Sequence, residues 1–329
     1  MRNLGCLLIV VQCLYSNFSS SCCCSCLAFE MKRVLVTGGN KGIGKAICRR
    51  LLEEYPDVHV LLGSRDVDRG ERAIQDILEQ VGRACSDRLE LIPIDTSSDE
   101  SVRQAAAASM GGGGGDDGGG DNALYGIINN AGIMEGTLAD VVNVNYFGPK
   151  RVFEVFRSQL RIPGGRIVNI ASASGPFFVQ GCRDGALYRK LAEPWTTTVR
   201  ELDHIAASSH PEGGMDPYGF SKALVNAYTL LLARNEPDLI INSVTPGWIK
   251  TDMTRNQGAT NPPSKGAVPP VWCLMDESLG RNNVPTGRYY GSDCVRSPLH
   301  VYRGPGDAPY DGPDGLEIQK KSTMRHESK

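Results

Sequence analysis

The sequence lacks a strong charge of either sign and lacks the cysteine spacing of a metal site. Its 329 residues include 35 lysines and arginines against 37 aspartates and glutamates, a formal net charge of −2. Proteins that bind nucleic acid usually carry a basic excess, so this balance gives no support for a polyanion partner. Beyond residue 26 the cysteines are scattered and form no Cys-x-x-Cys pair. We therefore expect no metal site and no disulfide framework, as in a protein of a reducing compartment.

A long apolar run is also missing. Within residues 1–30, Arg2 precedes an apolar run over residues 4–11, and small residues follow. The run is too short for a stable membrane span, and the pattern predicts a signal or transit segment. Two alternatives stay open: Met31 is the true start, or the cysteines of residues 22–26 are acylated. The compartment is accordingly the cytoplasm or, with a real targeting peptide, an organelle such as the plastid or the secretory route.

What the sequence does have is a regular alternation of apolar runs and amphipathic segments. Strands are expected at residues 34–37, 58–63, 89–94, 124–129, 165–170 and 239–244, and helices at 42–54, 66–81, 98–110, 140–160 and 218–235. This order predicts right-handed βαβ units in a Rossmann-like, doubly wound α/β fold with a parallel sheet, forming one domain over residues 31–304. Ligands in such a fold bind at the carboxyl ends of the strands.

Two segments do not fit this alternation. Residues 111–121 are nearly all glycine and aspartate, which predicts a flexible surface insert. The alternative, a phosphate-binding loop, is disfavoured because no strand leads into the segment. Residues 305–329 are rich in Gly, Pro, Asp and Lys, which predicts a disordered tail.

A glycine-rich turn joins the first expected strand to the first expected helix. Gly38, Gly42 and Gly44 lack Cβ atoms, so the backbone can turn sharply and a pyrophosphate can approach the helix N-terminus. The candidate cofactor contacts in this turn are Gly38, Asn40, Lys41, Gly42, Ile43 and Gly44. Glycine turns are common in loops, so the meaning of this one depends on the residues downstream.

Charged and small residues at the next strand ends indicate which nucleotide binds. Arg65 follows the second strand, where an arginine pairs with the 2′-phosphate of NADP and an acidic residue would favour NAD; Lys41 adds a second positive charge. The alternative is that both are solvated surface cations. Asp95 is a candidate acceptor for the adenine amino group. Asn129, Ala131 and Gly132 are expected beside the cofactor, with helix-cap or turn roles as alternatives.

A possible catalytic set follows. Tyr218 and Lys222 are spaced i, i+4, which places both on one helix face. A nearby ammonium stabilises a phenolate, so we expect Lys222 to lower the pKa of Tyr218 from about 10 and make it a general acid or base. Ser172, at the end of the fifth strand, is expected to hold a substrate oxygen, and Asn145 to bridge Lys222 to a water chain. Taken alone, a Tyr-x-x-x-Lys pair has the alternative that the two residues are neighbours on the surface of a helix without a catalytic role.

Taken together, these segments resemble a classical short-chain dehydrogenase/reductase, closest to the carbonyl reductase branch. The resembling segments are residues 37–44 (TGGNKGIG), 64–66 (SRD), 129–133 (NNAGI), 145–148 (NYFG), 166–172 (RIVNIAS), 218–222 (YGFSK) and 246–253 (PGWIKTDM). The resemblance implies a catalytic tetrad of Asn145, Ser172, Tyr218 and Lys222. It further implies that a segment containing Pro246, Gly247, Ile249 and Thr251 wraps the nicotinamide.

The resemblance also bears on activity and assembly. It implies reduction of an aldehyde or ketone by NADPH, with Tyr218 as the acid. Tyr218 follows Ser172 by 46 positions, more than in most classical members. We interpret residues 175–217 as a helical insert, which in the family covers the dimerisation face and implies a monomer; a surface excursion without effect on assembly is the alternative. Rival functions are a non-enzymatic NADP-binding regulator on the same fold and an organellar biosynthetic or pigment-pathway reductase.

Overall fold

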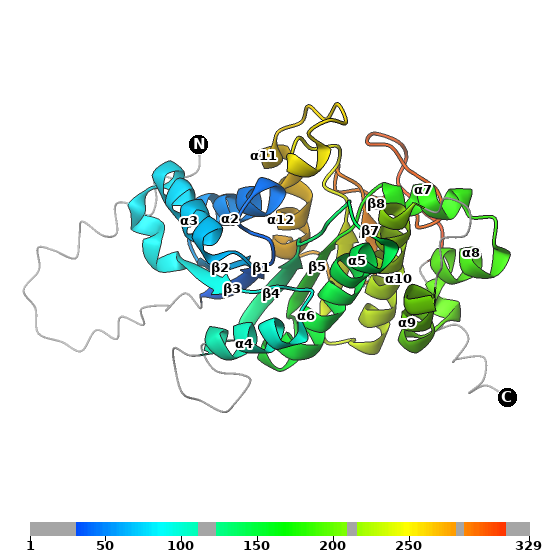
Figure 1. The fold of residues 1–329 in the computed structure, drawn as a ribbon, viewed down its shortest axis with the longest axis horizontal. Helices are drawn as coiled ribbons and strands as arrows, with labels where there is room; N and C mark the ends of the chain where they lie inside the picture. The colour runs from blue at the N-terminus through cyan, green and yellow to red at the C-terminus, as the bar shows by residue number, and fades with distance from the viewer. Residues whose placement is uncertain (1–30, 111–122, 209–215, 281–285, 314–329) are drawn as a thin grey trace, which may run out of the picture. The chain divides into compact units, whose positions relative to one another are not determined.

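The computed structural model describes residues 31–110, 123–208, 216–280 and 286–313, which belong to one compact α/β unit (Figure 1). Its strands are β1 (Lys32–Val36), β2 (Val58–Ser64), β3 (Leu89–Pro93), β4 (Leu124–Asn129), β5 (Arg166–Ile170), β6 (Ile240–Val244), β7 (Tyr289–Tyr290) and β8 (Arg296–Ser297). Its main helices are α2 (Gly42–Glu54), α3 (Val67–Val81), α4 (Asp99–Met110), α5 (Leu138–Val142), α6 (Gly148–Phe156), α7 (Ser174–Gly181), α8 (Gly185–Ala192), α9 (Val199–Ser208), α10 (Pro217–Asn235), α11 (Pro263–Gly266) and α12 (Val268–Met275).

The strands form a single sheet in the order β3-β2-β1-β4-β5-β6-β7-β8. All pairs from β3 to β7 are parallel, which confirms the predicted doubly wound sheet. Because β1 lies between β2 and β4, the chain reverses its winding direction there, and ligands bind at the carboxyl ends of strands beside such a point. The two-residue strands β7 and β8 were not predicted, and they pair antiparallel.

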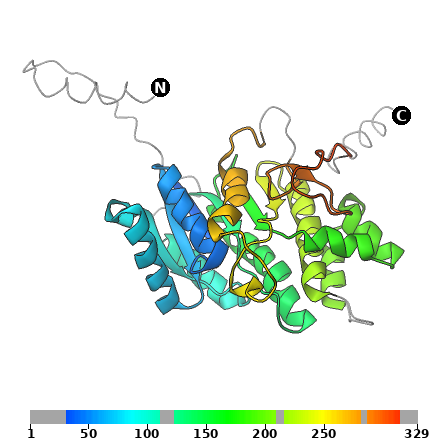
Figure 2. The same ribbon diagram turned by 90° about the horizontal axis from the view of Figure 1, so that it is seen from above.

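Alternation along the strands divides the core into two layers. Leu35 and Ile127 belong to one apolar cluster, whereas Val34 and Ile128 belong to the other. Successive strand residues point to opposite faces, so each buried strand supplies both layers. Helices α4, α6 and α10 cover the first face, and α2, α3 and α12 cover the second (Figure 2). Full burial of each large aliphatic side chain contributes about 1.5–3 kcal/mol.

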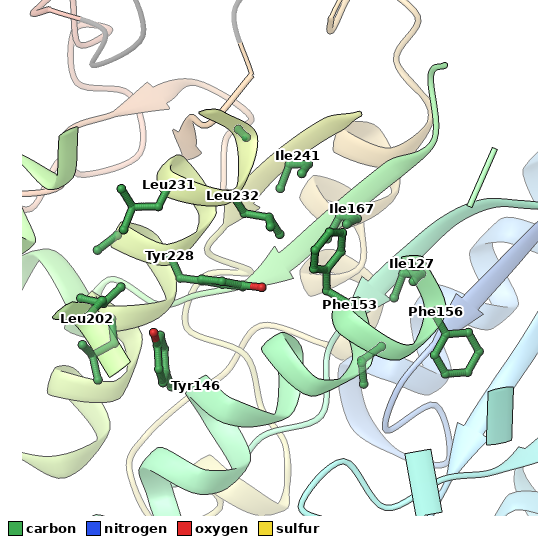
Figure 3. Close-up of a cluster of buried hydrophobic side chains, with 14 of the residues drawn as sticks. Ile127, Tyr146, Phe153, Phe156, Ile167, Leu202, Tyr228, Leu231, Leu232 and Ile241 are labelled. Carbon is green, nitrogen blue, oxygen red and sulfur yellow. The ribbon is translucent and has the colours of Figure 1, made fainter. Parts of the chain in front are cut away.

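Two aromatic residues mark the first layer, as Figure 3 shows. Tyr146 and Tyr228 pack edge to face with ring centroids 5.8 Å apart, and Leu202 of α9 lies beside them. Leu202 lies in the region predicted as a helical insert, and helices α7, α8 and α9 occupy its described part. This insert therefore adds to the main core instead of extending into solvent.

The helix expected over residues 140–160 is interrupted. Asn143–Phe147 form a π-helical turn between α5 and α6. Pro149 lies at the start of α6 and has no N–H to continue the α-helical ladder, which accounts for the break. Such turns are frequent at functional sites, and this one contains Asn145.

The predicted disorder of the tail is wrong for its first part. The backbone N–H of Tyr310 donates to the carbonyl of Arg296, and the Arg303 guanidinium donates to the carbonyls of Asp307 and Ala308. Three predicted segments lie outside the described residues: the targeting segment of residues 1–30, the glycine-rich insert of residues 111–121 and the last part of the tail, residues 314–329. In the part of the chain that is described, no helix is both long and apolar enough to cross a membrane.

Candidate active site

The predicted catalytic tyrosine and lysine lie in the first turns of α10. Asp216 begins this helix, because its carboxylate accepts hydrogen bonds from the backbone N–H groups of Tyr218 (3.1 Å) and Gly219 (3.0 Å). Lys222 lies one turn further, with its Nζ 5.6 Å from the centre of the Tyr218 ring. The same Nζ donates to the carbonyl oxygen of Ile170, at the end of β5, over 2.8 Å. Helix α10 and strand β5 are thereby joined at the site.

Ser172 reaches the same place through close helix packing. A Cβ on Gly219 would lie 3.0 Å from the Ser174 carbonyl oxygen, and one on Gly175 would lie 3.0 Å from the backbone of Lys222. Glycine at both positions lets the backbones of α7 and α10 come into contact. Ser172 Oγ accepts from the Ser174 N–H at 3.2 Å. This hydroxyl is therefore fixed beside the first turn of α10.

Asn145 completes the predicted set from the π-helical turn. Its Oδ1 accepts from the Ile133 N–H, and its Nδ2 donates to the Ile133 carbonyl, both at 2.8 Å. Nδ2 also donates to Ser221 Oγ at 3.0 Å. A Cβ on Gly132 would lie 3.2 Å from Asn145 Oδ1 and 3.6 Å from Lys222 Nζ. The absence of a side chain at Gly132 thus leaves room for both polar groups, and the four predicted residues meet at the carboxyl ends of β4 and β5.

Burial dominates the ionisation of the pair on α10. Burial lowers the pKa of Lys222 to about 8. Burial also raises the pKa of Tyr218; a hydrogen bond with Ser172 acts to lower it, and the charge of Asp216 adds to the rise. The expectation that Lys222 lowers this pKa is therefore wrong for the protein alone. The ammonium donates to the Ile170 carbonyl, and burial of the phenol, not the charge of Lys222, is the largest cause of the Tyr218 shift.

The glycine turn has the backbone that its sequence predicted. Gly38 and Gly42 have φ values of +65° and +54°, in the left-handed region that favours glycine. A Cβ on Gly44 would lie 2.2 Å from the Gly38 carbonyl oxygen, so only glycine fits there. Helix α2 starts at Gly42 with no side-chain cap and no acidic residue in its first turn. Its N–H groups and positive dipole end are consequently available to an anion.

Known proteins resemble this chain in sequence. The family model described as short chain dehydrogenase matches residues 32–184. Carbonyl reductase [NADPH] 3 of Mus musculus is 30% identical, over 73% of this chain and 90% of the relative. The chain belongs to the short-chain dehydrogenase/reductase family. (+)-Neomenthol dehydrogenase of Arabidopsis thaliana is 29% identical, over 79% of this chain and 96% of the relative.

The structural comparison agrees at the level of fold. Salutaridine reductase from Papaver somniferum superimposes with a TM-score of 0.65 at 22% identity, covering 79% of this chain and 99% of that one. The NADPH-bound carbonyl reductase from chicken fatty liver gives 0.58 at 20% identity, covering 82% and 99%. Members of this family are oxidoreductases that use nicotinamide cofactors. The glycine cradle and the uncapped start of α2 fit such a cofactor.

The two cations expected near the adenosine are both exposed. Lys41 Nζ contacts Asp252 Oδ2 at 3.1 Å, across the glycine turn. Arg65 is exposed at the end of β2. Burial acts to raise the pKa of Asp95, but hydrogen bonds from Ser97 and the charges of Arg65 and Arg151 outweigh it and lower this pKa. Asp95 Oδ1 accepts from Ser97, and the predicted adenine contact stays a prediction.

Hydrogen bonds fix the residues at the end of β4 and just after it. Asn129 is buried and donates to Asn169 Oδ1 within the sheet. Its neighbour Asn130, which we did not predict, donates to the carbonyls of Thr37 and Gly38 at 2.9 and 3.2 Å. Thr37 Oγ1 in turn accepts from the N–H groups of Asn130 and Ala131. These bonds fix the glycine turn against the end of β4. Ala131 and Gly132 follow at that junction, and their expected contacts with the cofactor stay predictions.

The segment after β6 lies against the glycine turn. A Cβ on Gly42 would lie 3.3 Å from the Thr251 side chain, so this predicted residue is close to the cradle. Gly247 has a φ of +89° and supplies the bend after Pro246. Ile249 is buried. The contacts that these residues make with nicotinamide stay predictions.

An exposed aromatic pair was not predicted from the sequence. Phe177 of α7 and Tyr302 stack with centroids 4.4 Å apart, although 53% and 38% of their surfaces are exposed. Tyr289, whose pKa burial raises, interacts electrostatically with both Tyr302 and Tyr218. Tyr289 is thus the residue through which Tyr302 and Tyr218 are related electrostatically. No local pattern joins residues so far apart in sequence.

Proposed function

We propose that this protein reduces an aldehyde or ketone to an alcohol with NADPH. The observation that carries the proposal is the meeting of Asn145, Ser172, Tyr218 and Lys222 beside the glycine cradle. Ser172 follows the end of β5, and Asn145 belongs to the π-helical turn. Tyr218 and Lys222 belong to α10, and Lys222 is bonded to the last residue of β5. A tyrosine, a hydroxyl and a cation at one point can bind, polarise and protonate a carbonyl oxygen.

Tyr218 is the proposed acid. Its raised pKa keeps the hydroxyl protonated at neutral pH, as donation of a proton requires. Ser172 and Tyr218 would hold the carbonyl oxygen between their hydroxyls. When bound, the reduced nicotinamide supplies the hydride that the carbonyl carbon accepts. One hydride and one proton then convert C=O to CH–OH.

Lys222 and Asn145 are the proposed supports of this acid. Lys222 would bind the ribose of the cofactor and return a proton toward Tyr218. Asn145 holds the Ile133 backbone, and Asn145 Oδ1 and Lys222 Nζ both lie within 4 Å of where a Cβ on Gly132 would stand. In this position Asn145 would order a water that connects the lysine to solvent. Fixing all four groups before the substrate arrives lowers the entropic cost of the reaction.

The preference for NADPH is inferred from charge and from relatives. Lys41 and Arg65 are exposed cations at the cradle and at the end of β2, where a 2′-phosphate would need them. The relatives from mouse, rat and human that carry the name carbonyl reductase also carry NADPH in it. The name of the Arabidopsis relative states a dehydrogenase, so alcohol oxidation with NADP is the second candidate.

A monomer is the proposed assembly. Helix α9 of the insert packs over α10, and its Asp203 binds both Tyr146 Oη (2.8 Å) and Lys150 Nζ (3.2 Å). The surface formed by α6 and α10 is thus partly covered by the protein's own insert. Light scattering of the full chain should give the mass of one chain, and a stable dimer would contradict this assignment.

The test of the proposed function is turnover with a panel of aliphatic, cyclic and aromatic carbonyls. Loss of nicotinamide absorbance should follow addition of at least one carbonyl with NADPH, and more slowly with NADH. An enzymatic role would be contradicted if the protein bound NADPH tightly but no carbonyl oxidised the NADPH and no alcohol reduced NADP.

A further inference from the structure

The ion pair between Lys41 and Asp252 joins two parts of the cofactor cradle. Lys41 immediately precedes α2, and Asp252 belongs to the loop after β6. Asp252 Oδ2 accepts from Lys41 at 3.1 Å, while its Oδ1 accepts from Arg255 at 2.8 Å. The hydrogen bonds from these two cations lower the pKa of Asp252, so the carboxylate is charged at neutral pH. The Asp252 carboxylate therefore already pairs with Lys41, the cation with which the 2′-phosphate would need to pair.

The loop holds Asp252 in a defined position. The Lys250 N–H donates to the Asn261 carbonyl at 2.8 Å and closes the base of the loop. Thr254 Oγ1 accepts from the Thr251 N–H at 3.0 Å and donates to the Ile249 carbonyl at 2.6 Å. Asp252 lies inside this tight turn. Its carboxylate is therefore a fixed feature beside the cradle, whereas Lys41 has a long flexible side chain that can change partner.

We propose that Asp252 limits the selectivity for NADPH over NADH by competing with the 2′-phosphate for Lys41. This inference rests on the proposed NADPH-dependent function. On binding, Lys41 exchanges the carboxylate for the phosphate, and Asp252 keeps Arg255 as its partner. NADH has no 2′-phosphate and requires no such exchange. The free energy needed to break the Lys41–Asp252 pair therefore weakens the binding of NADPH but not that of NADH.

The size of the effect follows from the exposure of the pair. Ion pairs between exposed groups are weak, so releasing Lys41 should improve NADPH binding about two- to fivefold. Salt screens such pairs, so the gain should shrink as ionic strength rises. Asp252→Asn removes the charge while keeping the size of the side chain. The matched control is Asp76→Asn, because Asp76 carries the same charge and pairs with Lys45, four residues after Lys41 in the first turn of α2.

The experiment is titration of the full chain with NADPH and with NADH, followed by nicotinamide fluorescence at low and high salt. Asp252→Asn should lower the Kd for NADPH about two- to fivefold and leave that for NADH nearly unchanged. Asp76→Asn should leave the ratio of the two Kd values at the wild-type level. Equal changes for both cofactors, or weaker NADPH binding, would overturn the proposal.

A double-mutant cycle separates exchange of Lys41 from simple repulsion between carboxylate and phosphate. In the Lys41→Ala background, Asp252→Asn should no longer favour NADPH. If the full gain persists there, Lys41 is not the group in competition, and the proposal is wrong. A wild-type protein that binds NADH at least as tightly as NADPH would instead refute the NADPH preference, which is a separate readout from the effect of Asp252.

Discussion

Lys222 Nζ donates a hydrogen bond to the carbonyl oxygen of Ile170 at 2.8 Å, two residues before Ser172. This contact ties the first turns of α10 to the end of β5. It brings the ammonium, the Ser172 hydroxyl and the Tyr218 ring into one small volume, although 46 positions separate the serine from the tyrosine. The position of Lys222 is thus set by the sheet, and its ionisation is set by burial.

The pH dependence of reduction should report Lys222. Its pKa is about 8, below the ordinary value of 10.5, and the proposed role needs the protonated form. We expect kcat/KM, which reflects the free enzyme, to fall as pH rises through about 8. Tyr218 has a raised pKa and would lose its proton only at higher pH. A kcat/KM that stays constant up to about pH 10 would show that the charge of Lys222 is not needed.

Gly44→Ala should disrupt the cradle. The added Cβ would lie 2.2 Å from the Gly38 carbonyl oxygen, so the backbone must move at a cost of about 1–3 kcal/mol. We expect a lower free energy of unfolding in urea and weaker binding of both NADPH and NADH. The control is Gly181→Ala in α7, where an added Cβ meets no atom within 4 Å. That variant should be as stable as the wild type or more so, by up to about 1 kcal/mol.

Tyr146→Phe tests how firmly the insert is attached. The Tyr146 hydroxyl donates to Asp203 of α9 at 2.8 Å, while the ring packs in the core. Removing only the hydroxyl should lower the free energy of unfolding by about 1.5–3 kcal/mol, the range for hydrogen bonds to charged groups. Tyr188→Phe, in α8 of the same insert, is the control, because its hydroxyl bonds no residue that the structure describes. Equal losses in the two variants would show that the bond to Asp203 contributes little.

Local sequence signals predicted the fold well, whereas the catalytic roles of the four site residues stay predictions. The order of apolar runs predicted six strands, and Tyr-x-x-x-Lys placed both residues on one helix, because such signals depend on neighbours along the chain. The short strands β7 and β8 give too little periodicity for a prediction. The π-helical turn at Asn145 could not be predicted, because it is a local change in backbone hydrogen bonding within a segment whose apolar pattern is that of one continuous helix.

Properties that depend on packing between distant segments could not be predicted. The direction of the Tyr218 pKa shift follows from burial under the surrounding elements, which the spacing to Lys222 does not reveal. The pairing of Lys41 with Asp252 likewise joins residues 211 positions apart. The same holds for the stacking of Phe177 on Tyr302, which needs the segment after β8 to return to α7.

The central claim is that Tyr218 donates the proton during carbonyl reduction. Tyr218→Phe keeps the ring and removes the hydroxyl, so the most direct measurement compares turnover and NADPH affinity in this variant and the wild type. The account predicts that kcat falls by about 10²- to 10⁴-fold, the usual contribution of a general acid, while the Kd for NADPH stays within about twofold. Turnover at the wild-type rate in Tyr218→Phe would contradict the account.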